Sequence, residues 1–467
     1  MLKVYDSKIR REVEFQPVRP GEVSFYVCGP TVQSSPHIGH IRVAVAFDVI
    51  RRYFAALGLK TRFVQNVTDI DDKILRKSHH AGVDWQSWAA RHEQEFFDAY
   101  TRLNVLLPDV IPHATQYISE QVKMIKKILA AGYAYEGTGA DVWFDTLAFT
   151  DYGALTNQGV GENLEASEED YRADKRNPRD FALWKTPHTT DPEDAAWDSP
   201  WGRGRPGWHI ECSAMATEIL GAKFDIHGGG LDLRFPHHEN ELAQARACGY
   251  EFANIWMHSA WVTAKGEKMS KSLGNGLSVS EVLAESRLNA LALRYAFSTV
   301  HYRSMLEWTP TTLESSKTAI IRLRERLCEI GGEKYTDDIV GAVDITEFDE
   351  FVKSMDNDFA VADAVAKVFT AVKRGDVSVL LIRRALNILG IDPLCDTWRK
   401  AFEEEDAVNQ NITTLELDEE SINSLIDKRN VAKSEKNYSV ADEIRADLLS
   451  RGVELIDTAN GTEWKVV

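Results

Sequence analysis

The sequence lacks any apolar run long enough to cross a membrane, and it has few cysteines. A membrane helix needs about 18 to 20 consecutive apolar residues, and none occurs in the 467 residues of the chain. The start, Met1 to Asp6, has no basic segment followed by an apolar one. Five scattered cysteines are too few for a disulfide framework. We therefore expect a cytoplasmic protein without membrane contact, whose cysteines are thiols or metal ligands.

Positive charge is also scarce. The chain has 54 Lys plus Arg against 72 Asp plus Glu, a formal net charge of -18. This balance disfavours non-specific attraction to polyanions, so any nucleic-acid site must be a local basic surface or a groove that reads shape. The remaining composition, 44% hydrophobic and 27% charged, is that of an ordinary globular protein. The length corresponds to roughly three domains.

The first part of the chain has a strand, helix, strand pattern. Residues Val23 to Val27 are β-branched or aromatic and end at Cys28-Gly29-Pro30, as a buried strand does before a turn. An apolar helical face then begins at Ile38 and is closed by Gly58, and Thr61 to Val67 reads as a second strand. This order predicts an α/β protein whose loops could hold a ligand.

The later segments differ in pattern. After an irregular stretch, a helix is expected at 213–220, a strand at 224–227 and a turn at Gly228–Gly230. From about residue 310 the pattern is helical, and the acidic run at 403–418 indicates a mobile linker. Two short helices within 422–449 and two strands around Gly461 are expected beyond it.

Two polar clusters could bind phosphate. His37-Ile38-Gly39-His40 stands where the first loop enters its helix, and backbone N–H groups at a helix start favour anions. Lys268 and Lys271 lie in a loop flanked by glycines, and their flexible ammonium groups suit a triphosphate. Taken singly, each cluster could equally be a solvated surface feature.

A third pattern suggests a metal site. His237 and Glu241 lie four residues apart, on one face of an expected helix. Cys28 and Cys212 could complete a set of two sulfurs, one nitrogen and one oxygen, which suits zinc. From the residues alone, His227 or Glu239 could serve equally, and inert buried cysteines are common. A metalloprotease is excluded, because Leu242 stands where the second histidine of that motif is required.

The two phosphate clusters resemble the paired signatures of class I aminoacyl-tRNA synthetases. The matching residues are His37-Ile38-Gly39-His40 and Lys268-Met269-Ser270-Lys271-Ser272. The resemblance implies a Rossmann-type domain that joins an amino acid to ATP, releases pyrophosphate, and passes the acyl group to the terminal ribose of tRNA. In that family's reaction His37 and His40 would stabilise the α-phosphate, and Lys268 and Lys271 the triphosphate, of ATP with magnesium.

Longer runs resemble the cysteinyl-tRNA synthetases. They are Phe25–Pro30, Asn66–Lys73, Trp208–Met215, His227–Leu233 and the His237–Glu241 run. This resemblance implies that one zinc ion is held by Cys28, Cys212, His237 and Glu241. It further implies that Thr68 and Trp208 line the amino-acid pocket, and that Gly39, Gly229, Gly230 and Asp232 contact ATP.

Pattern and resemblance together imply an α/β Rossmann-type parallel-sheet catalytic domain with an insertion, then a helical bundle and a small α+β module. The expected parts are the first half of the catalytic domain (1–118), a connective insertion (119–199), the second half with the zinc site (200–250), the Lys-Met-Ser-Lys-Ser loop and junction (251–309), a helical tRNA-contacting bundle (310–402), an acidic linker (403–418) and a C-terminal anticodon-recognition module (419–467). The implied partners are L-cysteine, ATP and tRNA(Cys), and we expect a monomer.

Two other functions compete with this interpretation. A ligase that transfers cysteine to an amino sugar in thiol-cofactor biosynthesis would resemble the catalytic body but lack the last fifty or so residues. A non-catalytic nucleotide- or RNA-binding paralogue would keep the fold without the chemistry, although the intact histidines and lysines argue against it. For the metal, four protein ligands would ordinarily indicate a purely structural zinc site. The alternative that we favour is that zinc holds the substrate sulfur.

Overall fold

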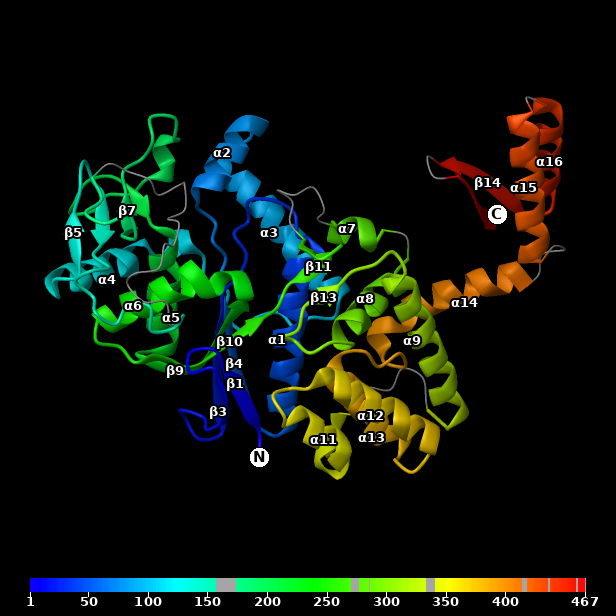
Figure 1. Cartoon of the computed structure of the whole chain (residues 1–467), viewed down its shortest axis with the longest axis horizontal. Helices are drawn as coiled ribbons and strands as arrows, with labels where there is room; N and C mark the ends of the chain where they lie inside the picture. Colours follow the sequence, from blue (N-terminus) through cyan, green and yellow to red (C-terminus); the bar gives the residue numbers. More distant parts are fainter. Residues whose placement is uncertain are drawn as a thin grey trace. The chain divides into compact units, whose positions relative to one another are not determined.

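The chain divides into two compact units, which are described separately. The computed structural model describes residues 1–156, 174–269, 277–284, 286–332, 341–413, 418–435, 437–458 and 461–466 (Figure 1). The first unit comprises Met1–Glu285 and Asn289–Asp396, and the second comprises Ser286–Leu288 and Thr397–Val467.

A four-stranded parallel sheet forms the centre of the first unit. Its strands are β3 (Glu22–Val27), β4 (Lys60–Gln65), β9 (Lys223–Gly230) and β10 (Phe252–Ser259), in the order β10-β9-β3-β4. Helix α1 (Ile38–Ala56) connects β3 to β4, whereas α6 (Glu239–Ala247) lies between β9 and β10. The chain therefore leaves β3 and β9 toward opposite edges of the sheet. Such a reversal leaves a crevice at the carboxyl ends of the two strands, where α/β proteins bind ligands.

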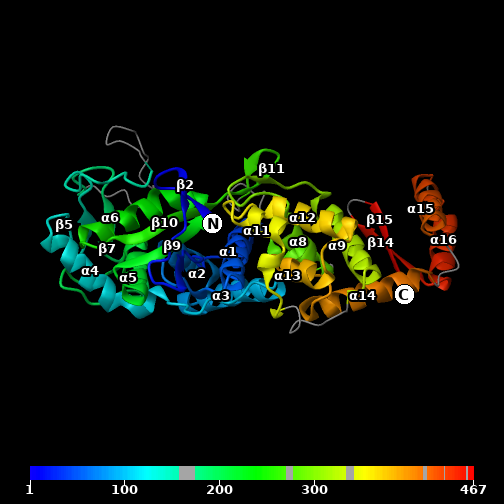
Figure 2. The same ribbon diagram turned by 90° about the horizontal axis from the view of Figure 1, so that it is seen from below.

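Helix α1 begins at the first phosphate cluster. The His37 ring accepts a hydrogen bond from the Gly39 N–H, and the His40 ring accepts one from the His37 N–H, at 3.1 and 3.2 Å. This reciprocal cap satisfies two of the backbone donors that a helix start leaves unpaired. The predicted apolar face of α1 is buried, and each aliphatic side chain fully removed from water contributes about 1.5 to 3 kcal/mol. Helices α5 (Trp208–Leu220) and α6 lie on the other side of the sheet from α1 (Figures 1 and 2).

The expected insertion contains an antiparallel sheet beside this core. Its strands are β5 (Ala134–Glu136), β6 (Val142–Phe144), β7 (Phe181–Lys185) and β8 (Arg205–Pro206), next to α4 (Ile118–Ala130). Strand β8 lies beyond residue 199, where the sequence analysis placed the end of the insertion. Helices α2 (Asp72–Ala81) and α3 (Trp85–Arg102) precede the insertion, and Asp71 caps α2 by accepting from the Lys73 N–H at 2.8 Å.

The predicted turn at Gly228–Gly230 is wrong, because all three glycines continue strand β9. These glycines let the strand pack closely against neighbouring side chains, and they do not turn the chain. A Cβ atom on Gly228 would stand 2.3 Å from the Phe47 ring, and one on Gly229 would stand 2.9 Å from the His238 ring. Glycine is required here because the strand runs against side chains with no space between them.

The rest of the first unit is mainly helical, as expected. Its remaining elements are the β1–β2 hairpin (Lys3–Asp6 and Arg11–Glu14), a small sheet of β11 (Val262–Ala264), β12 (Glu267–Lys268) and β13 (Leu306–Glu307), and helices α7 (Val279–Val282), α8 (Leu288–Ser298), α9 (Thr312–Glu329), α11 (Asp349–Met355), α12 (Val361–Arg374) and α13 (Val379–Leu389). On α9, Ile320, Leu323 and Leu327 are buried, as their spacing predicts, whereas Ile330 is partly exposed.

The second unit contains α14 (Arg399–Thr413), α15 (Glu419–Ser434), α16 (Tyr438–Ser450), β14 (Val453–Thr458) and β15 (Gly461–Val466). Residues 403–413, which we expected to be a linker, belong to helix α14. Glutamate has good helix propensity, and propensity outweighs charge repulsion in this run. The last two helices and two strands match the predicted pattern. They enclose a small core in which Ile422, Leu448 and Leu455 are buried and against which Trp464 packs.

Candidate active site

A pocket of about 380 Å³ opens at the carboxyl ends of the parallel strands. Its lining includes eight of the residues that the sequence analysis singled out: Cys28, His37, Gly39, His40, Trp208, Gly230, Asp232 and Lys268. Residues from both phosphate clusters thus border the same cavity, although about 230 residues separate them in the sequence. Lys271 lies outside the described residues.

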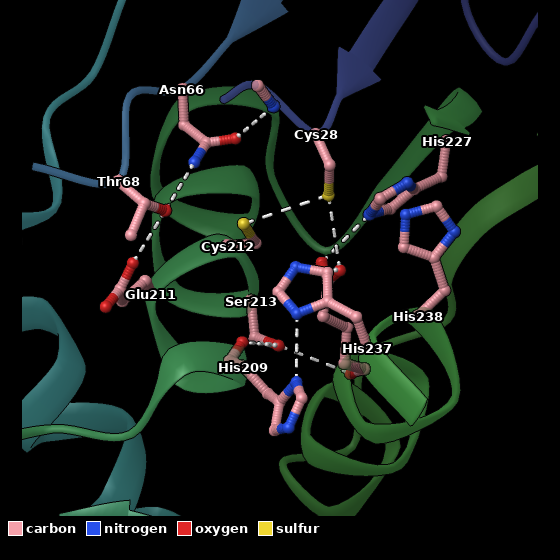
Figure 3. Close-up of polar contacts among 12 residues, drawn as sticks. Cys28, Asn66, Thr68, His209, Glu211, Cys212, Ser213, His227, His237 and His238 are labelled. Carbon is pink, nitrogen blue, oxygen red and sulfur yellow. Dashed lines mark hydrogen bonds and ion pairs between the residues drawn. The ribbon is translucent and has the colours of Figure 1, made fainter. Parts of the chain in front are cut away.

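The four expected zinc ligands lie together beside this pocket. Figure 3 shows three of them, Cys28, Cys212 and His237. Cys28 directly follows β3, and Cys212 is on α5. His237 lies in the turn of residues Arg234–His238 that leads into α6, and Glu241 is in the first turn of α6. Their ligand atoms all lie within 4.8 Å of one another, and all four residues are buried. Cys28 Sγ is 3.8 Å from Cys212 Sγ and 3.4 Å from Glu241 Oε1, and His237 Nε2 is 3.2 Å from the same oxygen.

The electrostatics of this cluster favour a cation. Burial raises the pKa of the Cys28 and Cys212 thiols, and burial lowers the pKa of His237 to about 3. His237 is therefore a neutral imidazole, with a lone pair available to a metal. Two thiols and a carboxylate crowded in a dry space repel one another when ionised, whereas a divalent ion holds thiols deprotonated. Two sulfurs, an imidazole and a carboxylate fit zinc.

A second set of ligands overlaps the first. Cys28, His227, His238 and Glu241 also converge within 4.8 Å. His227 Nε2 lies 2.9 Å from Glu241 Oε2, so the two oxygens of this carboxylate face different histidines. The sequence analysis left His227 open as a ligand, and the geometry leaves it open as well. Glu239, the other alternative, points elsewhere, because its carboxylate accepts from the backbone and the hydroxyl of Thr156 at 2.8 and 2.9 Å.

Trp208 and His209 support the expected ligand His237. The Trp208 ring stacks on the His237 ring with 4.2 Å between centroids, and His209 Nδ1 lies 2.9 Å from His237 Nδ1. A histidine that binds metal through Nε2 normally has its Nδ1 held by a hydrogen-bond partner of this kind. The sequence analysis did not identify His209. Its place in the run Trp208–Met215 was a signal, but the contact with His237 spans 28 residues and could not be read from local sequence.

Thr68 was expected to line the amino-acid pocket, but its hydroxyl is engaged elsewhere. It donates to Glu211 Oε2 at 3.0 Å, and Asn66 Nδ2 donates to it at 3.4 Å. Thr68 and Glu211 are both buried, and Thr68 is not among the residues that line the cavity in the described part of the chain. Burial, with Asp71 nearby, raises the pKa of Glu211 well above its usual range. The sequence analysis did not identify this buried carboxyl group.

The lining of the pocket includes the two histidines of the first cluster and Lys268 of the second. The His37 and His40 rings stack 3.6 Å apart at the start of α1. Lys268 Nζ lies 3.1 Å from Asp232 Oδ2 and 5.0 Å from the centre of the Trp261 ring. Imidazoles at a helix start, facing an ammonium group across a cavity, form a suitable environment for a polyphosphate.

Comparisons with known proteins agree with this geometry. The family model described as tRNA synthetases class I (C) catalytic domain matches residues 14–318. A cysteine–tRNA ligase of Bifidobacterium longum is 44% identical over all of this chain and 94% of its own length. The chain belongs to the cysteine–tRNA ligase family of class I tRNA synthetases. A cysteine–tRNA ligase of Beutenbergia cavernae is 43% identical, with coverage of 100% of this chain and 99% of that protein.

Solved structures show that the class I synthetase fold is shared more widely. A Mycobacterium tuberculosis methionyl-tRNA synthetase in complex with methionyl-adenylate has a TM-score of 0.56 at 14% identity, covering 84% of this chain and 93% of its own. A LeuRS–tRNA–LeuAMS complex from Agrobacterium radiobacter has a TM-score of 0.55 at 11% identity, covering 82% and 85%. These likenesses confirm the predicted Rossmann-type fold. As a class I synthetase, a cysteine–tRNA ligase uses ATP and binds an amino acid and a tRNA. None of the described helices is both long and apolar enough to span a membrane.

Proposed function

We propose that this chain charges tRNA(Cys) with L-cysteine. In the first step an oxygen of the cysteine carboxylate attacks the α-phosphorus of ATP, and the bond to the β-phosphate breaks to release pyrophosphate with magnesium. In the second step a hydroxyl of the 3′-terminal ribose attacks the acyl carbon, AMP leaves, and the hydroxyl proton is lost. The observation that carries the proposal is the buried Cys28, Cys212, His237 and Glu241 cluster beside a pocket that both signatures border.

The phosphate groups of the reaction would be handled by residues of the two signatures. His37 and His40 would donate to the α-phosphate oxygens as negative charge shifts there, while Gly39 lets the nucleotide approach the backbone. Lys268, together with Lys271, would neutralise the triphosphate. Asp232 would accept from the ribose, and Gly229 and Gly230 would leave room for the adenosine. Asp232 now holds Lys268, so binding of ATP would replace that ion pair with two contacts to substrate.

The amino acid would be selected at the buried cluster. Cys28, Cys212, His237 and Glu241 would hold one zinc ion, which supplies a Lewis acid that binds the cysteine sulfur as a thiolate. Serine offers only a weakly acidic hydroxyl of similar size, and steric contacts alone discriminate so small a difference by about 1 to 3 kcal/mol. Trp208 would cover the substrate side of His237. Thr68 would act from behind the pocket, through the position of Glu211.

The tRNA would bind through the later parts of the chain. We assign tRNA contact to the helical bundle of residues 310–402 and anticodon recognition to the module of residues 419–467. In that module Tyr438 is 62% exposed, so its ring is free to stack on an unpaired base, whereas Trp464 packs against the module's core. The boundaries at 118, 250 and 309 remain the proposed limits of the catalytic parts, whereas the insertion would extend past 199 to include strand β8.

A competition between acceptors tests the proposal. Purified protein would receive labelled cysteine and ATP together with either tRNA(Cys) or an amino sugar. Labelled tRNA is the expected product, because the chain has a folded module after residue 418 that the competing amino-sugar ligases lack. Acylated sugar with uncharged tRNA would overturn the choice of acceptor. Absence of cysteine-dependent ATP–pyrophosphate exchange would favour a non-catalytic paralogue instead.

A further inference from the structure

A buried guanidinium lies close to the first signature. Arg42 is on the second turn of α1, two residues after His40, and its side chain is buried with 2% exposure. It does not line the pocket in the described part of the chain. Arginine is one of the residue types least often fully buried, so its burial requires specific partners.

The partners of Arg42 are backbone carbonyls. Its Nη1 donates to the carbonyl oxygens of Ala260, at 3.1 Å, and Trp261. Its Nη2 donates to the carbonyl oxygens of His301, at 3.3 Å, and Ser304. Burial, with no acidic residue to offset it, lowers the pKa of Arg42 to about 10, so the group still carries its charge at neutral pH. The charge is therefore satisfied by four carbonyl dipoles instead of a carboxylate.

These carbonyls stand at the starts of two neighbouring strands. Ala260 and Trp261 immediately precede β11, and Ser304 lies two residues before β13. Strands β11 and β13 pair in parallel, and β11 also pairs with β12, in which Lys268 is opposite Thr263. The Arg42 guanidinium on α1 thus fixes the position at which strands β11 and β13 of this small sheet start. Lys268 is attached to the third strand of that sheet.

We propose that Arg42 is a positioning residue that sets the distance between the histidines at the start of α1 and Lys268. Without this clamp, the sheet β12-β11-β13 could shift relative to α1, since β11 and β13 are only three and two residues long. The five N–H donors and rigid plane of arginine suit this task, whereas lysine can reach only some of the four carbonyls. The inference rests on the proposed function, because it assigns both signatures to one transition state.

The expected kinetic effect is on turnover. Arg42→Met should lower kcat for cysteine-dependent ATP–pyrophosphate exchange roughly 10- to 100-fold, because a shift of about 1 Å between reacting groups costs that much. The KM for cysteine and the zinc content should stay within about twofold of wild type, since the metal cluster does not contact Arg42. Arg42→Lys should recover part of the lost kcat, as one ammonium group still bonds two or three carbonyls.

A matched control separates positioning from stability. Arg383 is another fully buried arginine; it bonds Asp392 Oδ2 and the Leu394 carbonyl oxygen at 3.0 and 3.1 Å and does not line the pocket. Arg383→Met should lower the melting temperature as much as Arg42→Met or more, and leave kcat unchanged below that temperature. Equal losses of kcat in both variants would reduce Arg42 to a structural role and overturn the proposal.

Hydrogen exchange tests the clamp without relying on activity. The N–H groups of Leu306 and Trp308 bond the carbonyl oxygens of Trp261 and Thr263, so they report on the β11–β13 pairing. In Arg42→Met they should exchange roughly tenfold faster than in wild type or Arg383→Met. Unchanged exchange would overturn the clamp, and faster exchange with unchanged kcat would overturn its catalytic role. If Arg42→Met does not fold, kcat and amide hydrogen exchange are both measured on Arg42→Lys instead.

The proposed function and the clamp can fail separately. Wild-type protein without cysteine-dependent ATP–pyrophosphate exchange would refute the proposed function, while amide hydrogen exchange would still decide whether Arg42 acts as a clamp.

Discussion

Cys28 Sγ lies 3.8 Å from Cys212 Sγ, although 184 residues separate the two cysteines in the chain. Cys28 lies at the carboxyl edge of the sheet because it directly follows strand β3. Helix α5 packs beside β9 and places Cys212 at the same edge (Figure 3). The other members of the cluster are a carboxylate and imidazoles. The fold therefore gathers ligands whose mutual repulsion a metal ion would relieve.

Removing one sulfur distinguishes the two overlapping sets of ligands. Cys212→Ser should lower the zinc bound per chain and reduce the preference for cysteine over serine, because a hydroxyl is a poor ligand for zinc. His238→Gln, which alters only the second set, should retain zinc. The measurements are elemental analysis after dialysis against a chelator and the ratio of kcat/KM for the two amino acids. Full zinc in Cys212→Ser together with loss in His238→Gln would assign the ion to His227 and His238.

His209 should affect the metal without touching it. His209→Ala removes the group that lies 2.9 Å from His237 Nδ1, so the His237 ring would lose its fixed orientation. Loss of such a partner typically costs 10- to 100-fold in metal affinity, and we expect a decrease of about that size. Competition with a colour-forming chelator measures it. His209→Asn, which can keep a hydrogen bond, is the control, and an unchanged affinity in His209→Ala would contradict the prediction.

The sequence was most informative where the argument was local. The strand before Cys28, the helix from Ile38 and the four-residue spacing of His237 and Glu241 follow from periodicity and turn residues, and the structure contains each of them. The choice of Cys212 as the second sulfur rested on resemblance, because nothing local to Cys28 indicates its partner.

The errors and omissions involve long-range packing. Gly228 looked like part of a turn, since the Phe47 ring that excludes a side chain there is on a distant helix. The sequence patterns did not single out Arg42. Its four carbonyl partners lie more than 200 residues further along the chain and leave no trace in composition or spacing.

Lys268 should be needed for adenylate formation and dispensable for metal binding. Lys268→Ala removes a charge from the lining of the pocket, and loss of one group that stabilises transition-state charge commonly lowers kcat by about 10²-fold. Cysteine-dependent ATP–pyrophosphate exchange should fall accordingly, while elemental analysis should find unchanged zinc. Asp232→Asn, which removes the ion pair with Lys268 but keeps a polar group, should lower kcat much less. Equal loss of zinc and activity in Lys268→Ala would mean that its assigned role is wrong.

A buried ion pair should make the first unit sensitive to acid. Asp48 on α1 accepts from Arg294 on α8, and also from Arg52 Nε at 2.8 Å and the Leu106 N–H at 2.9 Å. Burial alone would raise the pKa of Asp48, but Arg294 and Arg52 outweigh burial and the net effect lowers that pKa below 3.8. Because the pKa is lower in the folded than in the unfolded chain, the stabilisation is fully present above about pH 4 and is lost as the pH falls through the folded value.

Asp48→Asn should remove this pH dependence at a cost in stability. The variant leaves the buried Arg294 without its carboxylate, which typically destabilises by about 3 to 5 kcal/mol. The measurement is the melting temperature of the first unit as a function of pH. The difference between wild type and Asp48→Asn should be constant near neutral pH and should shrink below about pH 4. Asp349→Asn, which breaks a pair with Lys353 that is more than two-thirds exposed on both sides, should change the melting temperature little at any pH. The difference in melting temperature between wild type and Asp48→Asn could instead stay constant into acid. That result would show that Asp48 stabilises the unit through its hydrogen bonds alone, without the ion pair.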